Sequence, residues 1–500
     1  MTHFTFTDPN IETTGTFTVN GCTITAPIFT VEELPDILAV TRRHARRFYD
    51  GTHRSFEALT RSYALWSDPR YPLRQKALPI LAKITGFSEA NIASFGLFPF
   101  SLKALDVPYL SQLHQQLAGL IESGAYARFT PWQGGYIKGY GTPRLTLQNR
   151  PRQIVHNVAG NVVGPSWLST MLGAVAQTSQ FIKLPSRDLA SFMIYLQSLD
   201  DIAPEFRKTI ACGYYAGGGE IEDHLFREAD VVMGLGSSET MDAIARKLAR
   251  VNPQARLLRH GWSLSFHVVS RAYATAEIAE LAAWGVCAHD GNACFSPANI
   301  YVEAGGPLSP EQFAEQVAGH LASLAADIPP KASLGVAERV TNYRQTQLQR
   351  RLLGENVRVL KSRDTAYTVV VDWEDPRLTP TCQERTVVIK PVSDIWAVPR
   401  YAAHLNGHLQ TVGVAVPRPD ILDMADRLGA LGATNVRMLG TEYILDLAEC
   451  HDGVFNTAQM FMSDNLRWLN ISFSDTDAAI ADALRLKSRT LAQLGQAAAV

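Results

Sequence analysis

The sequence lacks several features that mark particular classes of protein. Its net charge is −2 over 500 residues, so it has no basic excess of the kind that binding to nucleic-acid phosphates generally needs. No apolar run approaches the roughly 20 residues that a membrane-spanning helix requires. The N-terminus has no basic stretch followed by an apolar run. We therefore expect a cytoplasmic protein without a secretory signal, an integral membrane segment or a nucleic-acid partner.

Cysteine is scarce, and its spacing excludes two common uses. No Cys-x-x-Cys pair occurs among the six cysteines, which are Cys22, Cys212, Cys287, Cys294, Cys382 and Cys450. Zinc sites and disulfide frameworks both need clustered or paired cysteines. The sequence therefore predicts free thiols in a reducing compartment and no metal site.

Strand and helix patterns alternate through the middle of the chain. Apolar strands are predicted at 154–158, 180–184, 209–215, 230–233, 256–258 and 265–269. Helical patterns separate them at 166–176, 189–199, 222–228 and 239–251. Such alternation is typical of βαβ units around a parallel sheet, so the predicted fold class is α/β. The chain is long enough for two to four domains.

Cys294 is the most informative residue. It follows a short polar turn, His289-Asp290-Gly291-Asn292-Ala293, and precedes Phe295-Ser296-Pro297. A helix is predicted at 275–287 and a strand at 299–303, so the thiol lies on exposed loop backbone between them. A thiolate there suits covalent acyl chemistry, because a thioester is a reactive intermediate. The alternative is an ordinary buried free cysteine.

Two segments of the alternating region suggest an anion site. Gly234-Leu235-Gly236-Ser237 joins a strand to a helix N-terminus, where backbone N–H groups favour phosphate. The third glycine of the dinucleotide fingerprint is missing, so an ordinary turn capped by Ser237 is the alternative. Lys183 ends a predicted parallel strand and points to the same crevice, unless it is a solvated strand-end charge. Arg187 follows shortly after Lys183, and it could equally be an ordinary surface residue.

Asn161 lies in the loop Val158-Ala159-Gly160-Asn161-Val162, between a strand and a helix. Its amide could donate to a carbonyl oxygen that gains negative charge, although a turn residue explains it equally well.

In this order the segments resemble the aldehyde dehydrogenase superfamily, and within it the LuxC-type acyl-thioester reductases of bacterial bioluminescence. The segments 158–162 and 294–297 match best, and the turn His451-Asp452-Gly453 and the strand 466–471 also match. The resemblance implies that Cys294 is the nucleophile and Asn161 its oxyanion donor. It also implies that the cofactor is bound by Lys183, Ser186, Arg187, Gly236 and Ser237.

The sequence departs from the family in two places. Gly291-Asn292-Ala293 replaces a glutamine that usually precedes the cysteine, which bears on the acyl pocket. His260 stands where hydrolytic aldehyde dehydrogenases carry a water-activating glutamate, with either a proton-transfer role or a structural, cofactor-adjacent one. The missing carboxylate favours exchange with a thiol over hydrolysis of an acyl enzyme.

The resemblance implies an oxidoreductase that reduces an acyl thioester to an aldehyde. Its substrate would carry CoA or phosphopantetheine, and an acyl carrier protein or an acyl-activating synthetase would be its partner. The acyl group is open: long-chain fatty, aryl or peptidyl. Other readings are a hydrolytic or CoA-acylating aldehyde dehydrogenase working oxidatively, release of an aryl or peptidyl thioester in natural-product biosynthesis, and a non-catalytic scaffold.

The cofactor is expected to be NADPH. Relatives that prefer NAD carry an acidic residue three positions after the lysine, and here that position is Ser186, followed by Arg187. A hydroxyl and a guanidinium would hold a 2′-phosphate that a carboxylate repels. The alternative is that Arg187 pairs with Asp188.

The implied architecture is aldehyde dehydrogenase-like, with a Rossmann-like cofactor domain, an α/β catalytic domain and a β arm for oligomerisation. The expected divisions are a mainly helical part at 1–135, the first arm strand at 136–156, the cofactor domain at 157–270, the catalytic domain with Cys294 at 271–455, and the last arm strand and helix at 456–500. Pairing of 144–156 with 466–473 would support a homodimer or homotetramer.

Overall fold

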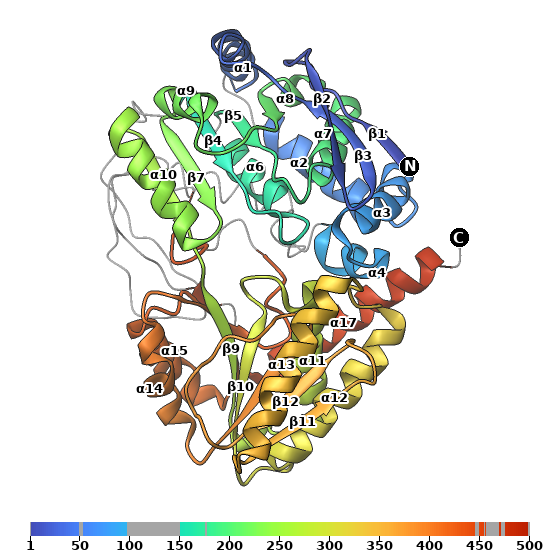
Figure 1. Cartoon of the computed structure of the whole chain (residues 1–500), viewed down its shortest axis with the longest axis vertical. Helices are drawn as coiled ribbons and strands as arrows, with labels where there is room; N and C mark the ends of the chain where they lie inside the picture. Colours follow the sequence, from blue (N-terminus) through green and yellow to red (C-terminus); the bar gives the residue numbers. More distant parts are fainter. Residues whose placement is uncertain are drawn as a thin grey trace.

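The computed structural model of the chain describes residues 2–49, 54–97, 151–175, 178–445, 450–454, 456, 470–471 and 476–498. Two large sheets occupy different halves of the molecule, the five-stranded one in the upper half of Figure 1 and the eight-stranded one in the lower half. Residues 98–150 lie outside the described residues, and with them the end of the helical part expected at 1–135 and most of the first arm strand expected at 136–156.

The upper sheet is entirely parallel, as the alternating pattern predicted. Its order is β6 (Ile210–Gly213), β5 (Ser179–Lys183), β4 (Gln153–Asn157), β7 (Val231–Leu235) and β8 (Arg256–His260). The chain starts in the centre, adds β5 and β6 on one side, and then crosses to add β7 and β8 on the other. The crossover leaves a crevice at the carboxyl end of β4, where ligands of open α/β sheets bind.

Helices cover both faces of this sheet because successive strand residues point to opposite sides. Val155 and Phe181 pack against α1 (Leu34–Phe48), α9 (Glu220–Glu228) and α10 (Ser238–Val251). Ile154 and Ile182 face the other layer, formed by α2 (Arg54–Ser67), α3 (Pro72–Thr85), α6 (Pro165–Val175) and α7 (Ser191–Ile202).

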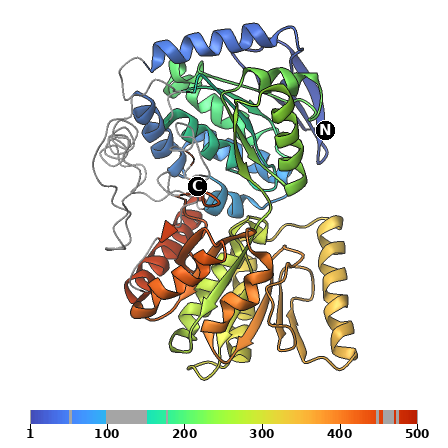
Figure 2. The same ribbon diagram turned by 90° about the vertical axis from the view of Figure 1, so that its left-hand side faces the viewer.

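The lower sheet is parallel except for its edge strand β11. Its order is β11 (Val357–Lys361), β12 (Thr368–Asp372), β13 (Thr386–Val392), β10 (Pro297–Glu303), β9 (Leu264–Val269), β14 (Leu409–Ala415), β15 (Asn435–Met438) and β16 (Asn470–Ile471). Its helices are α11 (Ala276–Cys287), α12 (Pro310–Asp327), α13 (Leu334–Leu352), α14 (Val398–Ala402), α15 (Ile421–Ala430) and α17 (Thr476–Ala498). The turned view in Figure 2 shows the two halves one above the other.

A small third sheet at the N-terminus joins the upper half. It consists of β1 (Thr2–Thr5), β3 (Cys22–Pro27) and β2 (Thr14–Val19), with β3 in the middle. The turn after β1 places Asp8 against Arg207, at the end of the short helix α8 (Pro204–Arg207). Their charged groups lie 2.9 Å apart and are almost completely buried. Asp8 also accepts a hydrogen bond from the backbone N–H of Cys212 on β6, so the pair fastens the small sheet to the large one.

Three strand assignments differ from the expected divisions. Strand β9 was placed with the cofactor domain, but it pairs with β10 and β14 of the lower sheet. Residues 153–156 were placed in an oligomerisation arm, but they form β4, which is buried at the centre of the upper sheet. Within the described part of the expected second arm strand, Asn470 and Ile471 pair with β15. Alternating apolar residues predict a strand, but they do not specify its sheet.

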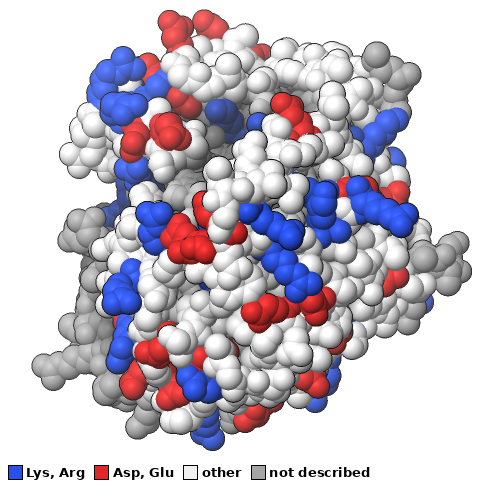
Figure 3. Space-filling view, turned by 60° about the horizontal axis from the view of Figure 1, so that its bottom comes forward, with Lys and Arg blue, Asp and Glu red and all other residues white. Residues whose placement is uncertain are grey.

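The surface and helices agree with the composition. On the face shown in Figure 3, basic and acidic side chains are interspersed, in keeping with the net charge of −2. None of the described helices combines the length and the apolar character needed to span a membrane.

The buried contact between Asp8 and Arg207 predicts a large effect on stability. An Asp8→Ala substitution leaves a guanidinium buried, with the half-exposed Asp200 at 3.6 Å as its remaining acidic neighbour. Breaking a buried ion pair from one side costs about 3 kcal/mol or more. We expect a lower melting temperature for this variant by calorimetry, whereas Asp68→Ala, which removes an exposed partner of Arg70, should leave it nearly unchanged. Equal melting temperatures for the two variants would contradict the assignment.

Candidate active site

The carboxyl ends of upper-sheet strands and the amino ends of lower-sheet strands open into one cavity of about 790 Å³. The upper sheet contributes the loop after β4, which carries Asn161, together with Lys183 at the end of β5 and the turn after β7. The lower half contributes Cys294, in the loop between α11 and β10. Residues that the sequence places far apart therefore share one space.

The Cys294 loop begins with an unusual run of backbone conformations. Helix α11 ends at Cys287, and then His289, Asp290 and Gly291 have φ values of 50°, 53° and 72°. Only glycine adopts this left-handed region at little cost. At Gly291 a side chain would also approach the backbone nitrogen of Arg385 to 3.3 Å. Both the backbone conformation and this close approach therefore favour glycine.

A second left-handed segment holds the first in place. Gln383, Glu384 and Arg385 all have positive φ, from 51° to 63°. The Arg385 guanidinium lies 2.6 Å from the Asp290 carboxylate, and both side chains are buried. The backbone N–H of Arg385 also donates to the Asp290 carbonyl, at 2.9 Å. Two strained segments therefore stabilise each other directly beneath the loop that carries Cys294.

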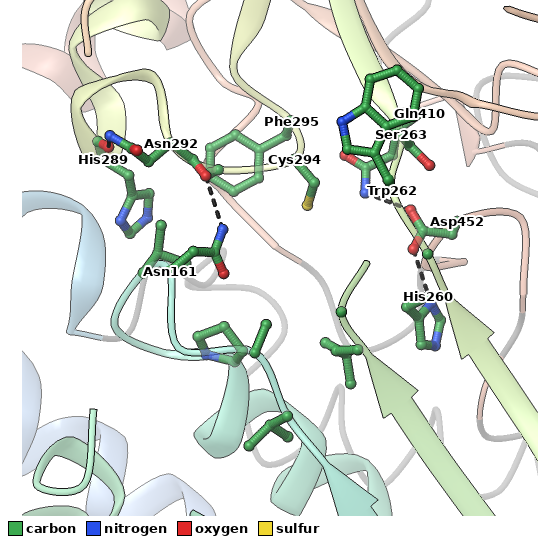
Figure 4. Close-up of a pocket in the computed structure, with 18 of the residues that line it drawn as sticks. Asn161, His260, Trp262, Ser263, His289, Asn292, Cys294, Phe295, Gln410 and Asp452 are labelled. Carbon is green, nitrogen blue, oxygen red and sulfur yellow. Dashed lines mark hydrogen bonds and ion pairs between the residues drawn. The ribbon is translucent and has the colours of Figure 1, made fainter. Parts of the chain in front are cut away.

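Two asparagines fix the near side of the loop. The buried amide of Asn292 donates to the carbonyls of His289 and Asp290 and to the Glu384 carboxylate. The backbone carbonyl of Asn292 accepts a hydrogen bond from Asn161 Nδ2, at 2.9 Å (Figure 4). Asn161 thus lies in the cavity beside the loop that carries Cys294, and its hydrogen bond ties the upper half to the lower half.

The Cys294 thiol is open to the cavity, whereas Cys22, Cys212, Cys287 and Cys450 are buried and Cys382 is half-buried. The enclosing walls, followed by the carboxylate of Asp452, raise the pKa of the thiol to about 12, above its ordinary value of 9. The side chain of Gln410 works in the opposite direction and lowers the pKa of the thiol. The resting residue is therefore a thiol that needs a proton acceptor before it attacks.

His260 ends β8 on the far side of the cavity, and its ring is buried. Nδ1 lies 3.0 Å from Asp452 Oδ2, and Nε2 lies 3.1 Å from Asn456 Oδ1. The ring also stacks on His451, with centroids 4.2 Å apart. The structure therefore places His260 among polar partners near Cys294, with no direct contact to the sulfur among its hydrogen bonds.

The expected cofactor residues lie along the upper wall. Gly236 and Ser237 form the turn before α10, where Ser237 caps the helix by accepting a hydrogen bond from the Thr240 backbone N–H. Lys183 lies 5.0 Å from the Tyr215 ring, and burial lowers its pKa while Glu222 opposes that shift. Ser186 and Arg187 are exposed and line the cavity. Asp188 is buried and accepts hydrogen bonds from Ser191 rather than facing the cavity.

The sequence did not single out Gln410 or Asn456 as site residues, and it noted His451 and Asp452 only as a matching turn. Gln410 is the clearest omission, because it is a polar residue in the otherwise mostly apolar strand β14. A buried polar side chain in such a strand is a signal that sequence reading could have used. Gln410 and its hydrogen-bond partner Asp452, however, both lie more than a hundred residues from Cys294 in the sequence.

Comparisons with known proteins agree with this geometry. A family model described as acyl-CoA reductase (LuxC) matches residues 52–463. A long-chain acyl-protein thioester reductase from Photorhabdus laumondii is 23% identical over 248 residues. A protein with the same description from Photorhabdus luminescens is 24% identical. Each alignment covers 47% of this chain and 47% of the relative, so the chain spans about half the length of the relatives it matches.

Solved aldehyde dehydrogenases share the fold. A salicylaldehyde dehydrogenase from Pseudomonas putida G7 superposes with a TM-score of 0.63 at 14% identity, covering 96% of both chains. An aldehyde dehydrogenase from Mycobacterium tuberculosis, complexed with NAD⁺, gives 0.62 at 13% identity and covers 94% of this chain and 98% of its own. These similarities confirm the aldehyde dehydrogenase-like α/β fold.

Two buried histidines beside the site predict a dependence of stability on pH. Burial lowers the pKa values of His156 and His289 to about 3, so both are neutral when folded. Unfolding frees them to bind protons below about pH 6.5. The stability that they contribute is therefore complete above that pH and is lost as the pH falls, by about 1.4 kcal/mol per pH unit for each.

We expect the melting temperature to fall between about pH 7 and pH 5, and His156→Gln to make that fall shallower. His404→Gln, at an exposed position, is the matched control and should keep the wild-type slope. A pH-independent melting temperature would show that these histidines are not neutral in the folded protein.

Proposed function

Because the chain belongs to the LuxC acyl-CoA reductase family, we propose that it reduces an acyl thioester to an aldehyde with NADPH, through an acyl group held on Cys294. The observation that carries the proposal is the open Cys294 thiol, in a cavity between the carboxyl ends of upper-sheet strands and the amino ends of lower-sheet strands. The carrier thiol would be CoA or phosphopantetheine, and the acyl group a long fatty chain, as in the names of the two matched reductases.

The chemistry begins with attack of the Cys294 sulfur on the thioester carbonyl. A carbon–sulfur bond forms to the enzyme, the bond to the carrier sulfur breaks, and the carrier leaves as a thiol with the proton that Cys294 gives up. Hydride addition to the acyl carbon produces a thiohemiacetal oxyanion on Cys294. Its collapse releases the aldehyde and the cysteine thiolate, which takes a proton from solvent.

Two N–H groups are proposed to stabilise the oxyanion. The Asn161 amide has one N–H engaged with the Asn292 carbonyl, and its second N–H is chemically equivalent to that donor. The second group is the backbone N–H of Cys294. The backbone carbonyl of Cys294 accepts a hydrogen bond from the Ser265 hydroxyl at 2.7 Å, which fixes this part of the loop. One such donor is typically worth about 3 kcal/mol in the transition state.

The cavity wall fits a nicotinamide dinucleotide. The crevice beside β4, the N-terminus of α10 and the ammonium group of Lys183 supply the N–H dipoles and the charge that a pyrophosphate and ribose need. NADPH bound there supplies the hydride. Ser186 and Arg187 are proposed to hold its 2′-phosphate, and this role is strengthened by the turning of Asp188 toward Ser191.

Hydrolysis of the acyl enzyme is disfavoured by the surroundings of His260. Water activation needs a free base, but both ring nitrogens of His260 already face oxygen atoms of Asp452 and Asn456. The acyl group is therefore left for hydride or for a returning thiol. Proton transfer remains the proposed role of His260.

The expected domain divisions and the homodimer or homotetramer are kept as proposals. The boundary between the cofactor and catalytic domains is moved to the stretch between His260 and Leu264, where the chain passes from the upper sheet to the lower one.

Replacing the nucleophile tests the proposal. We expect Cys294→Ala to lower aldehyde formation from a panel of acyl-CoA and acyl-carrier thioesters by about 1000-fold or more, since covalent catalysis is lost. Intact-protein mass spectrometry without cofactor should show an acyl adduct on the wild type and none on the variant. Cys382→Ser changes the half-buried thiol and is the matched control, expected to keep both signals. Near wild-type reduction by Cys294→Ala would refute the mechanism.

Arg187 tests the choice of cofactor. Removing one charge-assisted hydrogen bond to a phosphate costs about 1.5–3 kcal/mol. We therefore expect Arg187→Ala to lower kcat/KM for NADPH by about tenfold or more and to leave the value for NADH nearly unchanged. Arg351→Ala, at an exposed position on α13, should change neither. Equal or better use of NADH by the wild type would contradict the proposal.

A further inference from the structure

A line of polar contacts leads from Cys294 away from the Asn161 side of the cavity. Gln410 lines the cavity together with Cys294, its side chain works to lower the pKa of the thiol, and its Nε2 donates to Asp452 Oδ1. The second carboxylate oxygen of Asp452 lies 3.0 Å from His260 Nδ1. Figure 4 shows Gln410 and Asp452 between Cys294 and His260. The thiol is thus connected to a buried imidazole through two side chains.

The hydrogen-bond partners of His260 allow its ring to hold an additional proton. Both ring nitrogens face oxygen atoms, those of Asp452 and of Asn456. A neutral imidazole has one N–H and satisfies one such acceptor, whereas an imidazolium has two and satisfies both. The carboxylate of Asp452 stabilises the positive charge that results. A ring with both nitrogens protonated therefore leaves neither N–H group without an acceptor.

His451 completes the surroundings without competing for that proton. Its ring stacks on His260 at an angle of 14°, and burial, followed by the neighbouring His260, lowers its pKa to about 4. The ligand atoms of His260, His451 and Asp452 lie within 4.8 Å of one another, which suggests a metal site. However, imidazole lone pairs lie in the plane of each ring, and one ion cannot lie in the planes of two parallel stacked rings. The geometry suits a proton better.

Gln410 carries an unmet hydrogen-bonding group beside the thiol. Its side chain is buried, its Nε2 is committed to Asp452, and its Oε1 has no hydrogen-bond partner within the described part of the chain. A buried acceptor without a donor costs about 1–3 kcal/mol. A donor that arrives with the substrate removes that cost, and the S–H group of a departing carrier thiol is such a donor.

We propose that Gln410, Asp452 and His260 form a proton-holding unit that takes the Cys294 proton during acyl transfer and returns it to the departing carrier thiol. The proposal rests on the proposed function, because it requires attack by Cys294. The S–H bond of Cys294 breaks, the proton passes to the Asp452–His260 pair, and the carrier sulfur takes it up when its bond to the acyl carbon breaks. Asp452 and His260 hold the proton in transit, and Gln410 positions the Asp452 carboxylate through its hydrogen bond.

The charge balance explains why the unit needs the carboxylate. At rest the negative charge is on Asp452, and it opposes a second negative charge on Cys294. Moving the proton neutralises the Asp452–His260 pair at the moment when the sulfur becomes a thiolate, so two adjacent anions never coexist. Among the described residues, the charged or titratable groups that face this unit include Cys294 on one side and His451 on the other.

Asp452→Asn separates this role from a merely structural one. Removing the negative charge beside the sulfur makes the thiolate easier to form, so iodoacetamide should alkylate Cys294 about tenfold faster, or more, near pH 8. The same substitution removes the proton acceptor, so thioester reduction should fall by about 100-fold or more. Structural damage would not make the thiol more reactive while slowing turnover.

Gln410→Leu is the complementary variant. It removes the side chain that lowers the pKa of the thiol and leaves the carboxylate, so both alkylation and reduction should be slower than in the wild type. The two variants therefore shift alkylation in opposite directions while both slow turnover. His404→Gln, an exposed histidine substitution, should leave both rates unchanged. Melting temperatures confirm that the variants are folded.

The inference is overturned if Asp452→Asn alkylates no faster than the wild type, or if it reduces thioesters within about threefold of the wild-type rate. Alkylation is measured without substrate or cofactor, so it reports on the unit even if no acyl adduct ever forms. The absence of an adduct on wild-type Cys294 would instead count against the proposed function.

Discussion

The buried ion pair between Asp290 and Arg385 is the contact on which the position of Cys294 depends. It joins two short segments that both have left-handed backbone conformations, and each such residue costs about 1–3 kcal/mol unless its surroundings enforce it. Asn91 and the backbone N–H of Lys331 also donate to the Asp290 carboxylate, so the charge is compensated from several sides. The cost of the strained loop is offset by this network, and the thiol is held out into the cavity.

The Cys294 loop lies at the cavity that strands of both large sheets line. The crossover in the upper sheet opens a crevice at β4, and the loop after α11 brings Cys294 to the same place from the lower sheet. The hydrogen bond from Asn161 to the Asn292 carbonyl is the direct link between these two sources. Cys294 and Asn161 thus come from different sheets, and this hydrogen bond joins the loops that carry them.

The sequence predicted the local elements well because they depend on neighbouring residues. The helix expected at 275–287 is observed as Ala276–Cys287, and the strand expected at 154–158 as Gln153–Asn157. The exposure of Cys294 was also expected, since a polar turn precedes it. The sheet to which Leu264–Val269 belongs was not predictable in this way, because its apolar pattern fits either sheet. Gln410 and Asp452 were missed as partners of Cys294 for the same reason: only the tertiary fold brings them together.

A histidine in place of a glutamate does more than remove a group that would activate water. A glutamate there would bring a free carboxylate to the cavity, whereas His260 brings a ring whose two nitrogens are bound by Asp452 and Asn456. Its nitrogens are directed at these two side chains rather than at a water molecule beside Cys294. If an acyl group forms on Cys294, the same change that protects it from water also provides a place for the proton that its formation releases. Selection against hydrolysis and assistance to thiol exchange would then have one physical origin.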